Sequence, residues 1–132
     1  MLTVVDRQQI TETLSLHAFV VDENRLERLG EVFTPDATYD MTRSGMGVFE
    51  GIESMRAAAG HMLAAGVAPL SHFVTNVVIT ETGESTASVR SKALMIMPDG
   101  TPHGVVYDDE VTLLDGHWLI SSRVISPMRS AA

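Results

Sequence analysis

The chain has 132 residues, a formal net charge of −8 and no cysteine. A chain of this length forms one domain with a single core, so residues 1–132 are expected to be one unit. The composition excludes disulfides, a thiolate nucleophile and cysteine-based zinc sites, and an acidic charge without a basic stripe argues against nucleic acid as a partner. Because neither a signal-peptide pattern nor a long apolar run occurs, we expect a soluble, cytoplasmic protein with no membrane partner.

The first third of the chain has the periodicity of helices. Asp6 is expected to cap a first helix that ends near Asp22. The apolar face of this helix, at nearly helical spacing, comprises Ile10, Leu14, Ala18 and Val21. A short second helix is expected over residues 26–33, and it ends there because a residue before a proline, here Thr34, disfavours helical backbone angles.

Glycines and a third helix occupy the middle of the chain. Residues 38–41 predict a short strand, and the glycines at positions 45, 47 and 51 predict a flexible loop. Apolar residues then recur at helical spacing over about residues 52–65. Gly66 is expected to end this helix.

The second half of the chain predicts long strands rich in β-branched residues. The expected strands cover residues 73–80, 85–97, 105–114 and 118–126, with a loose tail at 128–132. Asp115-Gly116 predicts a two-residue hairpin turn. Helices followed by a strand meander predict an α+β fold, in which four or five mostly antiparallel strands curl around the helices and enclose a cavity. The outer sheet face is apolar as well, which favours a homo-oligomer.

Asp22 and His72 are candidates for a general-base pair. A carboxylate beside an imidazole fixes the tautomer of the ring and stabilises the imidazolium that forms when the ring takes a proton. His72 is expected to share its strand face with Val74, Asn76 and Val78. Each residue also has a structural interpretation, Asp22 as a helix cap and His72 as a core histidine that bonds a backbone carbonyl.

Other polar and sulfur-containing side chains are candidates for the same pocket. Tyr107 is a candidate proton donor, or it is a packing residue of a strand. For Arg123 three roles are open: binding an oxyanion, pairing with Asp22, or a purely structural role. Asn76 is a candidate hydrogen-bond donor to substrate. Methionines, including Met55 and Met95, are candidates for adaptable walls of a lipophilic pocket.

The order of several short segments resembles the NTF2-like superfamily of cone-shaped α+β barrels, and within it the SnoaL-like branch. The matching segments span nearly the whole chain. They are Val20-Val21-Asp22, the stretch from Leu29 to Phe33-Thr34-Pro35-Asp36-Ala37, Phe49-Glu50-Gly51, Ser71-His72-Phe73-Val74-Thr75-Asn76, Tyr107-Asp108, and Asp115-Gly116-His117-Trp118-Leu119-Ile120 with Arg123. The branch includes scytalone dehydratase and lindane dehydrochlorinase, which perform eliminations without a cofactor.

The resemblance implies roles for four residues. Asp22 and His72 fall where those enzymes have their Asp–His pair, and Arg123 falls where the dehydrochlorinase has a functional arginine. His17 stands where the relatives tend to have a tyrosine or lysine, and this departure keeps a polar group but changes its acidity. His17 is therefore a candidate to hold a leaving group or a substrate carbonyl, or a half-buried packing residue.

Two functions follow from these patterns. The first is a dehydratase-like lyase or an isomerase that acts on a small, hydrophobic, cyclic substrate, with His72 as base and His17, Tyr107 or Arg123 stabilising negative charge. No cofactor and no metal are expected, because no dinucleotide loop and no metal-ligand spacing occurs in the sequence. The second is a binding or scaffold module with the same fold and no turnover.

Overall fold

The computed structural model describes residues 1–129. In chain order its elements are α1 (Val4–Asp22), the 3-10 helix η1 (Leu26–Glu31), β1 (Phe33–Asp40), the 3-10 helix η2 (Thr42–Ser44), β2 (Val48–Glu50), α2 (Ile52–Ala64), β3 (Ser71–Gly83), β4 (Thr86–Ile96), β5 (Pro102–Leu114) and β6 (His117–Pro127). Of the tail expected to be loose, Met128 and Arg129 belong to no element, and 130–132 lie outside the described residues. Within residues 1–129, neither α-helix has the length and apolarity needed to span a membrane.

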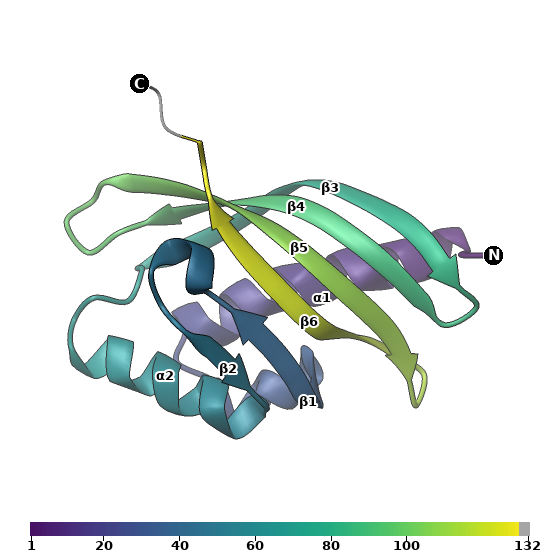
Figure 1. Ribbon diagram of the computed structural model, residues 1–132, viewed down its shortest axis with the longest axis horizontal. Helices are drawn as coiled ribbons and strands as arrows, with labels where there is room; N and C mark the ends of the chain where they lie inside the picture. Colours follow the sequence, from purple (N-terminus) through teal and green to yellow (C-terminus); the bar gives the residue numbers. More distant parts are fainter. Residues whose placement is uncertain (130–132) are drawn as a thin grey trace.

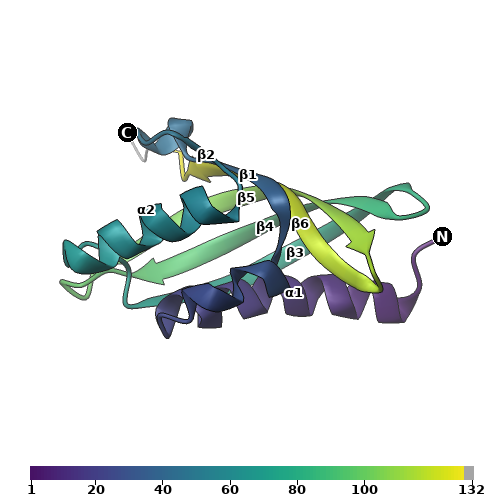
Figure 2. The ribbon, with the colours of Figure 1, turned by 90° about the horizontal axis from the view of Figure 1, so that it is seen from below.

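All six strands form one curved sheet, in the order β2-β1-β6-β5-β4-β3. The four long strands pair antiparallel with their neighbours in the sequence, whereas β1 pairs with β6 in parallel. The sheet bends over α1, and α2 lies beside β1 and β2 (Figures 1 and 2). The expected α+β fold is confirmed, with two corrections. The sheet has six strands instead of four or five, and in the described residues it stays open, because its edge strands β2 and β3 do not pair with each other.

The segment between the two α-helices differs from the sequence prediction. Phe33 begins β1 instead of closing a helix, and Pro35 lies within this strand. The proline is tolerated because the register between β1 and β6 is interrupted between Phe33 and Thr38, where no ladder bond from residue 35 is needed. The expected glycine loop also contains η2 and the short strand β2, which pairs antiparallel with β1.

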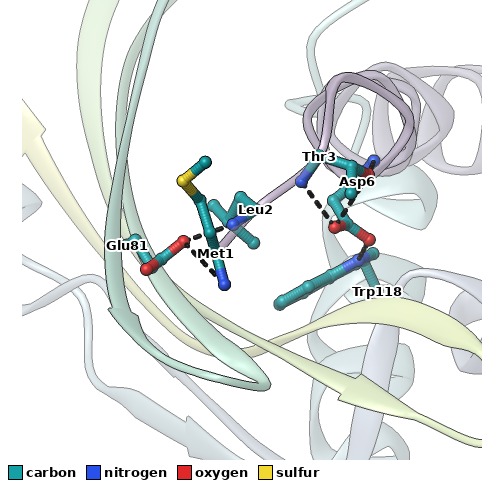
Figure 3. Close-up of polar contacts among 6 residues, drawn as sticks. All are labelled: Met1, Leu2, Thr3, Asp6, Glu81 and Trp118. Carbon is teal, nitrogen blue, oxygen red and sulfur yellow. Dashed lines mark hydrogen bonds and ion pairs between the residues drawn. The ribbon is translucent and has the colours of Figure 1, made fainter.

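Three polar residues fix the start of α1. Thr3, and not the predicted Asp6, is the N-cap (Figure 3). The Thr3 hydroxyl accepts the Asp6 backbone N–H at 3.0 Å, and Asp6 Oδ2 accepts the Thr3 backbone N–H at 2.8 Å. Asp6 Oδ1 also accepts the indole N–H of buried Trp118 at 3.1 Å. The bond between Asp6 and Trp118 therefore joins the start of α1 to β6.

A bulge in β3 decides which of its residues face the helices. The register with β4 shifts over residues 75–78, and Asn76 has a φ of 55°, a left-handed conformation that asparagine tolerates. The extra residue turns Val77 toward the core, whereas Asn76 and Val78 are exposed. The prediction that Asn76 and Val78 share a strand face with His72 is therefore wrong.

Two predicted glycine turns are present. Gly66, with a φ of 72°, follows the end of α2, where its N–H bonds the carbonyl of Leu63. Asp115 and Gly116 have φ values of 49° and 79° and connect β5 to β6. Positive φ at both central residues is the geometry of a type I′ hairpin turn, so the sequence pattern identified this turn correctly.

The outer face of the sheet has exposed apolar side chains. Phe73 on β3 and Leu94 on β4 are cross-strand partners and are 54% and 43% exposed. On the inner face of β4, Ala87, Val89 and Ala93 are buried. The expected alternation of two apolar faces is confirmed, and the homo-oligomer expected to cover the outer face stays a prediction.

Candidate active site

Asp22 and His72 meet where α1 ends and β3 begins. Asp22 Oδ1 lies 2.6 Å from His72 Nδ1, and Asp22 Oδ2 accepts the backbone N–H of His72 at 2.8 Å. The side chains of Asp22 and His72 are 15% and 12% exposed. A carboxylate can only accept hydrogen bonds, so Nδ1 of His72 carries the proton and Nε2 keeps a lone pair. The fold thus brings together the two residues that the sequence separates by fifty positions.

A second polar assembly, fully buried, joins α1, β5 and β6. Arg123 donates from Nε to Asp109 Oδ1 at 2.7 Å and from Nη2 to Asp109 Oδ2 at 2.9 Å, and both side chains are 0% exposed. Arg123 Nη1 lies 3.1 Å from His17 Nδ1. A guanidinium can only donate, so Nδ1 of His17 accepts this bond. The proton of the neutral His17 ring is therefore on Nε2.

The charges of this assembly follow from burial and pairing. Burial lowers the pKa of His17 well below its ordinary value, and the neighbouring Arg123 and His72 lower it further. Burial by itself lowers the pKa of Arg123, but the adjacent carboxylate of Asp109 reverses the effect and raises this pKa above its ordinary value. At neutral pH, His17 is therefore neutral and Arg123 is charged.

Two tyrosines lie beside the buried assembly. The guanidinium of Arg123 stacks 3.8 Å from the ring centroid of Tyr107, a cation–π contact. The rings of Tyr39 and His17 have centroids 6.1 Å apart. Burial is the main cause that raises the pKa of both Tyr39 and Tyr107. Both side chains are therefore neutral phenols at neutral pH.

These side chains border an apolar pocket of about 140 Å³. Its polar side chains are His17, Tyr39, His72 and Tyr107, and the ring centroids of the two histidines are 6.1 Å apart. Its apolar lining comes from both α-helices and the sheet and includes Phe33, Phe49, Val105, Ile125 and five methionines, Met41, Met46, Met55, Met62 and Met95. An apolar cavity of roughly 150 Å³ accommodates benzene, so this volume suits a ring-sized molecule. In residues 1–129, no group of three or more His, Asp or Glu side chains is placed to hold a metal ion.

The structure assembles most, but not all, of the predicted site. The predicted residues that line the pocket are His17, Met55, His72, Met95 and Tyr107. Asp22 and Arg123 are not part of the lining, and each bonds a histidine that is. Asn76 is exposed at the β3 bulge and is absent from the lining, so its prediction as a substrate-binding residue is corrected.

Asp109 and Tyr39 were not among the predicted residues. The segment compared with the family ended at Asp108, which forms only an exposed ion pair with Arg90 at 3.2 Å. Asp109 shares its strand face with Tyr107, and a carboxylate on the inner face of a strand is itself a signal of a buried partner. Tyr39 gave no comparable signal, because the strand that places it was expected to be only a few residues long.

Comparisons with known proteins agree with this architecture. A family model described as a SnoaL-like domain matches residues 3–124. A search of curated proteins gives no match. Many solved structures have similar folds, and three of them illustrate the similarity. An NTF2-like protein with a cystatin-like fold from Novosphingobium aromaticivorans has 19% identity and a TM-score of 0.79, over 98% of this chain and 86% of that chain.

The other two structures have names that refer to individual proteins. A candidate scytalone dehydratase from Novosphingobium aromaticivorans has 21% identity and a TM-score of 0.82, over 96% of this chain and 86% of that chain. LinA has 21% identity and a TM-score of 0.80, over 96% of this chain and 92% of that chain. At these identities the similarity shows the fold alone, and the NTF2-like architecture expected from the sequence is confirmed.

Proposed function

Because this chain belongs to the SnoaL-like domain family, we propose that it is an enzyme that removes a proton from a small, mostly apolar, cyclic molecule without a cofactor. The observation that carries the proposal is the 2.6 Å contact between Asp22 and His72, with His72 on the wall of an apolar pocket. The reaction class is elimination, by dehydration or dehydrohalogenation, with isomerisation and ring closure as close alternatives. All of these reactions begin with removal of a proton from carbon.

His72 is the general base in this proposal. Asp22 holds Nδ1, so Nε2 accepts the proton from the substrate, and the carboxylate stabilises the imidazolium that results. A second hydrogen bond, from the backbone N–H of His72 to Asp22, fixes the carboxylate relative to the ring. A positioned base of this kind contributes about 10²–10⁴-fold to a rate.

Three finer expectations belong to the same proposal. Membership of the SnoaL-like domain family, together with the resemblance of the sequence to the branch that includes scytalone dehydratase and lindane dehydrochlorinase, supports a lyase. The exposed apolar pair Phe73 and Leu94 supports a dimer or trimer formed through the outer sheet face. The absence of cysteine supports a cytoplasmic location.

The test is a reaction screen with small cyclic compounds in D₂O. The panel comprises cyclic ketones, cyclic β-hydroxyketones and chlorinated cyclohexanes. The readouts are deuterium incorporation, water loss detected as a new double bond, and chloride release. We expect wild-type protein to accelerate at least one of these reactions. In the His72→Ala variant that rate should be lower by a factor of about 10²–10⁴, and the melting temperature should stay close to that of wild type.

Control variants separate the base from the remainder of the fold. His103→Ala changes an exposed histidine at the start of β5 and should leave the rate unchanged. A rate that survives His72→Ala would exclude His72 as the base. If no member of the panel reacts but apolar rings bind and raise the melting temperature, the protein is the binding module that the sequence also allowed.

A further inference from the structure

The pocket presents two histidines in opposite tautomers. Asp22 fixes the proton of His72 on Nδ1, so the unprotonated Nε2 is the available atom of that ring. Arg123 donates to Nδ1 of His17, so the available atom of the second ring is the protonated Nε2. With ring centroids 6.1 Å apart, the same pocket offers a hydrogen-bond acceptor and a hydrogen-bond donor side by side.

The tautomer of His17 is fixed from outside the pocket. His17 is part of the pocket lining, whereas Arg123 and Asp109 are not, so the imidazole separates the ion pair from the cavity. Arg123 cannot rotate away without breaking two bonds to a carboxylate that is 0% exposed. Among the described residues no hydrogen bond is formed by Nε2 of His17. The donor therefore has its N–H available for a ligand.

Resting on the function proposed for His72, we propose that His17 is a neutral Nε2–H donor to a substrate oxygen, and that the substrate is a cyclic carbonyl compound with an acidic α-hydrogen. Arg123 and Asp109 are positioning residues in this assignment, because they act only through His17. The carbonyl oxygen and the α-carbon are two bonds apart, so one carbonyl group can contact both rings at once. This narrows the substrate class from any molecule with an acidic C–H to an enolisable ketone or a close relative.

The step balances without any added reactant. The α C–H bond breaks, and its proton goes to Nε2 of His72. The electron pair of that bond forms a carbon–carbon double bond, and the carbonyl π pair moves to the oxygen, which becomes an enolate. His17 Nε2–H donates to this oxygen throughout, and its hydrogen bond strengthens as negative charge develops. In a dehydration, the electron pair on the enolate oxygen re-forms the carbonyl, the pair at the α-carbon forms the α,β double bond and the β C–O bond breaks. The departing hydroxide takes the proton of the His72 imidazolium and leaves as water. In an isomerisation of a β,γ-unsaturated ketone, the carbonyl re-forms and the imidazolium returns its proton to the γ-carbon.

A neutral imidazole is suited to this role and unsuited to others. Because burial and Arg123 lower the pKa of His17, the ring does not become an imidazolium that could hand a full proton to a leaving group. A neutral histidine can nevertheless polarise a carbonyl, as one does in triosephosphate isomerase, an enzyme of unrelated fold. Carbon-bound chlorine accepts hydrogen bonds poorly, so a chlorinated ring would leave the donor unsatisfied.

The first test is the tautomer of His17 in the wild-type protein. With ¹⁵N-labelled histidine, long-range correlations from the ring C–H protons to nitrogen distinguish Nδ1–H, Nε2–H and imidazolium forms. We expect His17 to be the Nε2–H tautomer at pH 7, and the neutral form of His72 to be the Nδ1–H tautomer. In Arg123→Met the His17 signal should become a mixture of tautomers, and Arg123→Lys should restore Nε2–H. An Nδ1–H or imidazolium signal for His17 in wild type overturns the proposal.

The second test measures recognition of oxygen, and it needs no turnover. The probes are 4-nitrophenol and nitrobenzene, which differ by one hydroxyl group. We expect wild type to bind 4-nitrophenol at least about tenfold more tightly, the value of one hydrogen bond to a charged or strongly polar oxygen. His17→Leu should abolish this preference, and His17→Gln, which keeps an N–H donor, should retain part of it.

The two proposals can fail separately. A preference for 4-nitrophenol that disappears in His72→Ala but survives His17→Leu would mean that His72 alone holds the oxygen, and it overturns the role of His17. An absent preference in wild type overturns it as well. If the preference depends on His17 while no compound in the reaction screen loses a proton, the donor assignment stands and the base function of His72 fails.

Discussion

His72 and His17 are the same residue type in the same pocket, but their surroundings are opposite. His72 is bonded by a carboxylate, is 12% exposed and has its second nitrogen available as an acceptor. His17 is 4% exposed and is bonded by a guanidinium, which leaves a donor. The hydrogen-bonding capacity of an imidazole is thus decided by the partner of its other nitrogen. With an anion as partner the available nitrogen is an acceptor, and with a cation as partner it is a donor.

The two polar assemblies also differ in how much of their surface is exposed to solvent. Arg123 and Asp109 share two hydrogen bonds and are 0% exposed, so neither has contact with water. Asp22 and His72 keep 15% and 12% exposure, so protons can be exchanged between this pair and a ligand or solvent. A fully buried ion pair thus lies next to a pair that keeps contact with solvent.

The largest expected effect comes from Asp22→Asn. Asp22 Oδ2 accepts the backbone N–H of His72, so the amide oxygen of the asparagine takes that place and its NH₂ faces Nδ1. The proton of the ring then moves to Nε2, and His72 becomes a donor like His17. Proton removal in the reaction screen should fall by about 10²–10⁴-fold, with little change in the melting temperature. Asp108→Asn, at a half-buried position on β5 that is not part of the pocket lining, is the matched control. An unchanged rate in Asp22→Asn would contradict the pairing.

The next effect is on stability, from Arg123→Met. This change leaves the carboxylate of Asp109 buried without a partner, which costs about 3–5 kcal/mol in the free energy of unfolding. Arg90→Met is the control, because the ion pair between Arg90 and Asp108 is exposed and should contribute about 0–1 kcal/mol. Urea denaturation monitored by circular dichroism gives both values. An equal loss in the free energy of unfolding for the two variants would show that the buried ion pair contributes no more to stability than the exposed one.

The pH dependence of stability distinguishes His17 from surface histidines. Burial lowers the pKa of folded His17, whereas an unfolded histidine takes a proton below about pH 6.5. Between these two pKa values the unfolded state binds more protons, so the free energy of unfolding decreases as the pH falls, by up to about 1.4 kcal/mol per pH unit. Urea titrations from pH 7.5 to 5.5 should show this slope in wild type and in His103→Gln, and a smaller slope in His17→Gln. A slope that persists in His17→Gln would assign it to other groups.

The smallest expected effect concerns the start of α1. Thr3→Ala removes the N-cap hydroxyl that accepts the Asp6 backbone N–H, and it should cost about 0.5–2 kcal/mol. Thr11→Ala makes the same chemical change at an exposed position in the middle of the helix, where alanine has the higher helix propensity, so it should be neutral or slightly stabilising. A difference of less than about 0.3 kcal/mol between the variants would show that the cap does not limit stability.

The parts of the fold that have strong periodicity could be predicted from the sequence. The apolar spacing in α1, the β-branched runs of the long strands and the Asp115-Gly116 turn all indicated their elements correctly. Only the end of β1 was predicted, as a strand over residues 38–41, and β2 was not recognised. Pro35 and several glycines interrupt the pattern there, and pairing with β6 and β2 determines the extent of β1. A propensity argument cannot supply such a pairing.

The candidate site could be predicted in part for a similar reason. Asp22, His72 and His17 fall on segments whose position in the fold was anticipated, and the structure places all three at the pocket or bonded to its lining. Asn76 was misplaced because a single extra residue in β3 reverses the side-chain alternation, and nothing in a strand of β-branched residues marks where a bulge occurs. Asp109 was missed because its role depends on an ion pair with Arg123, which lies fourteen residues later on the neighbouring strand.

The five methionines of the pocket wall connect ligand binding to oxidation. Met41, Met46, Met55, Met62 and Met95 make up five of the eight methionines in the chain. A thioether is flexible and apolar, but peroxide converts it to a polar, stiffer sulfoxide that reductases can reverse. Oxidation of these side chains would therefore make the pocket wall more polar and weaken the binding of an apolar ring, and reduction would restore it.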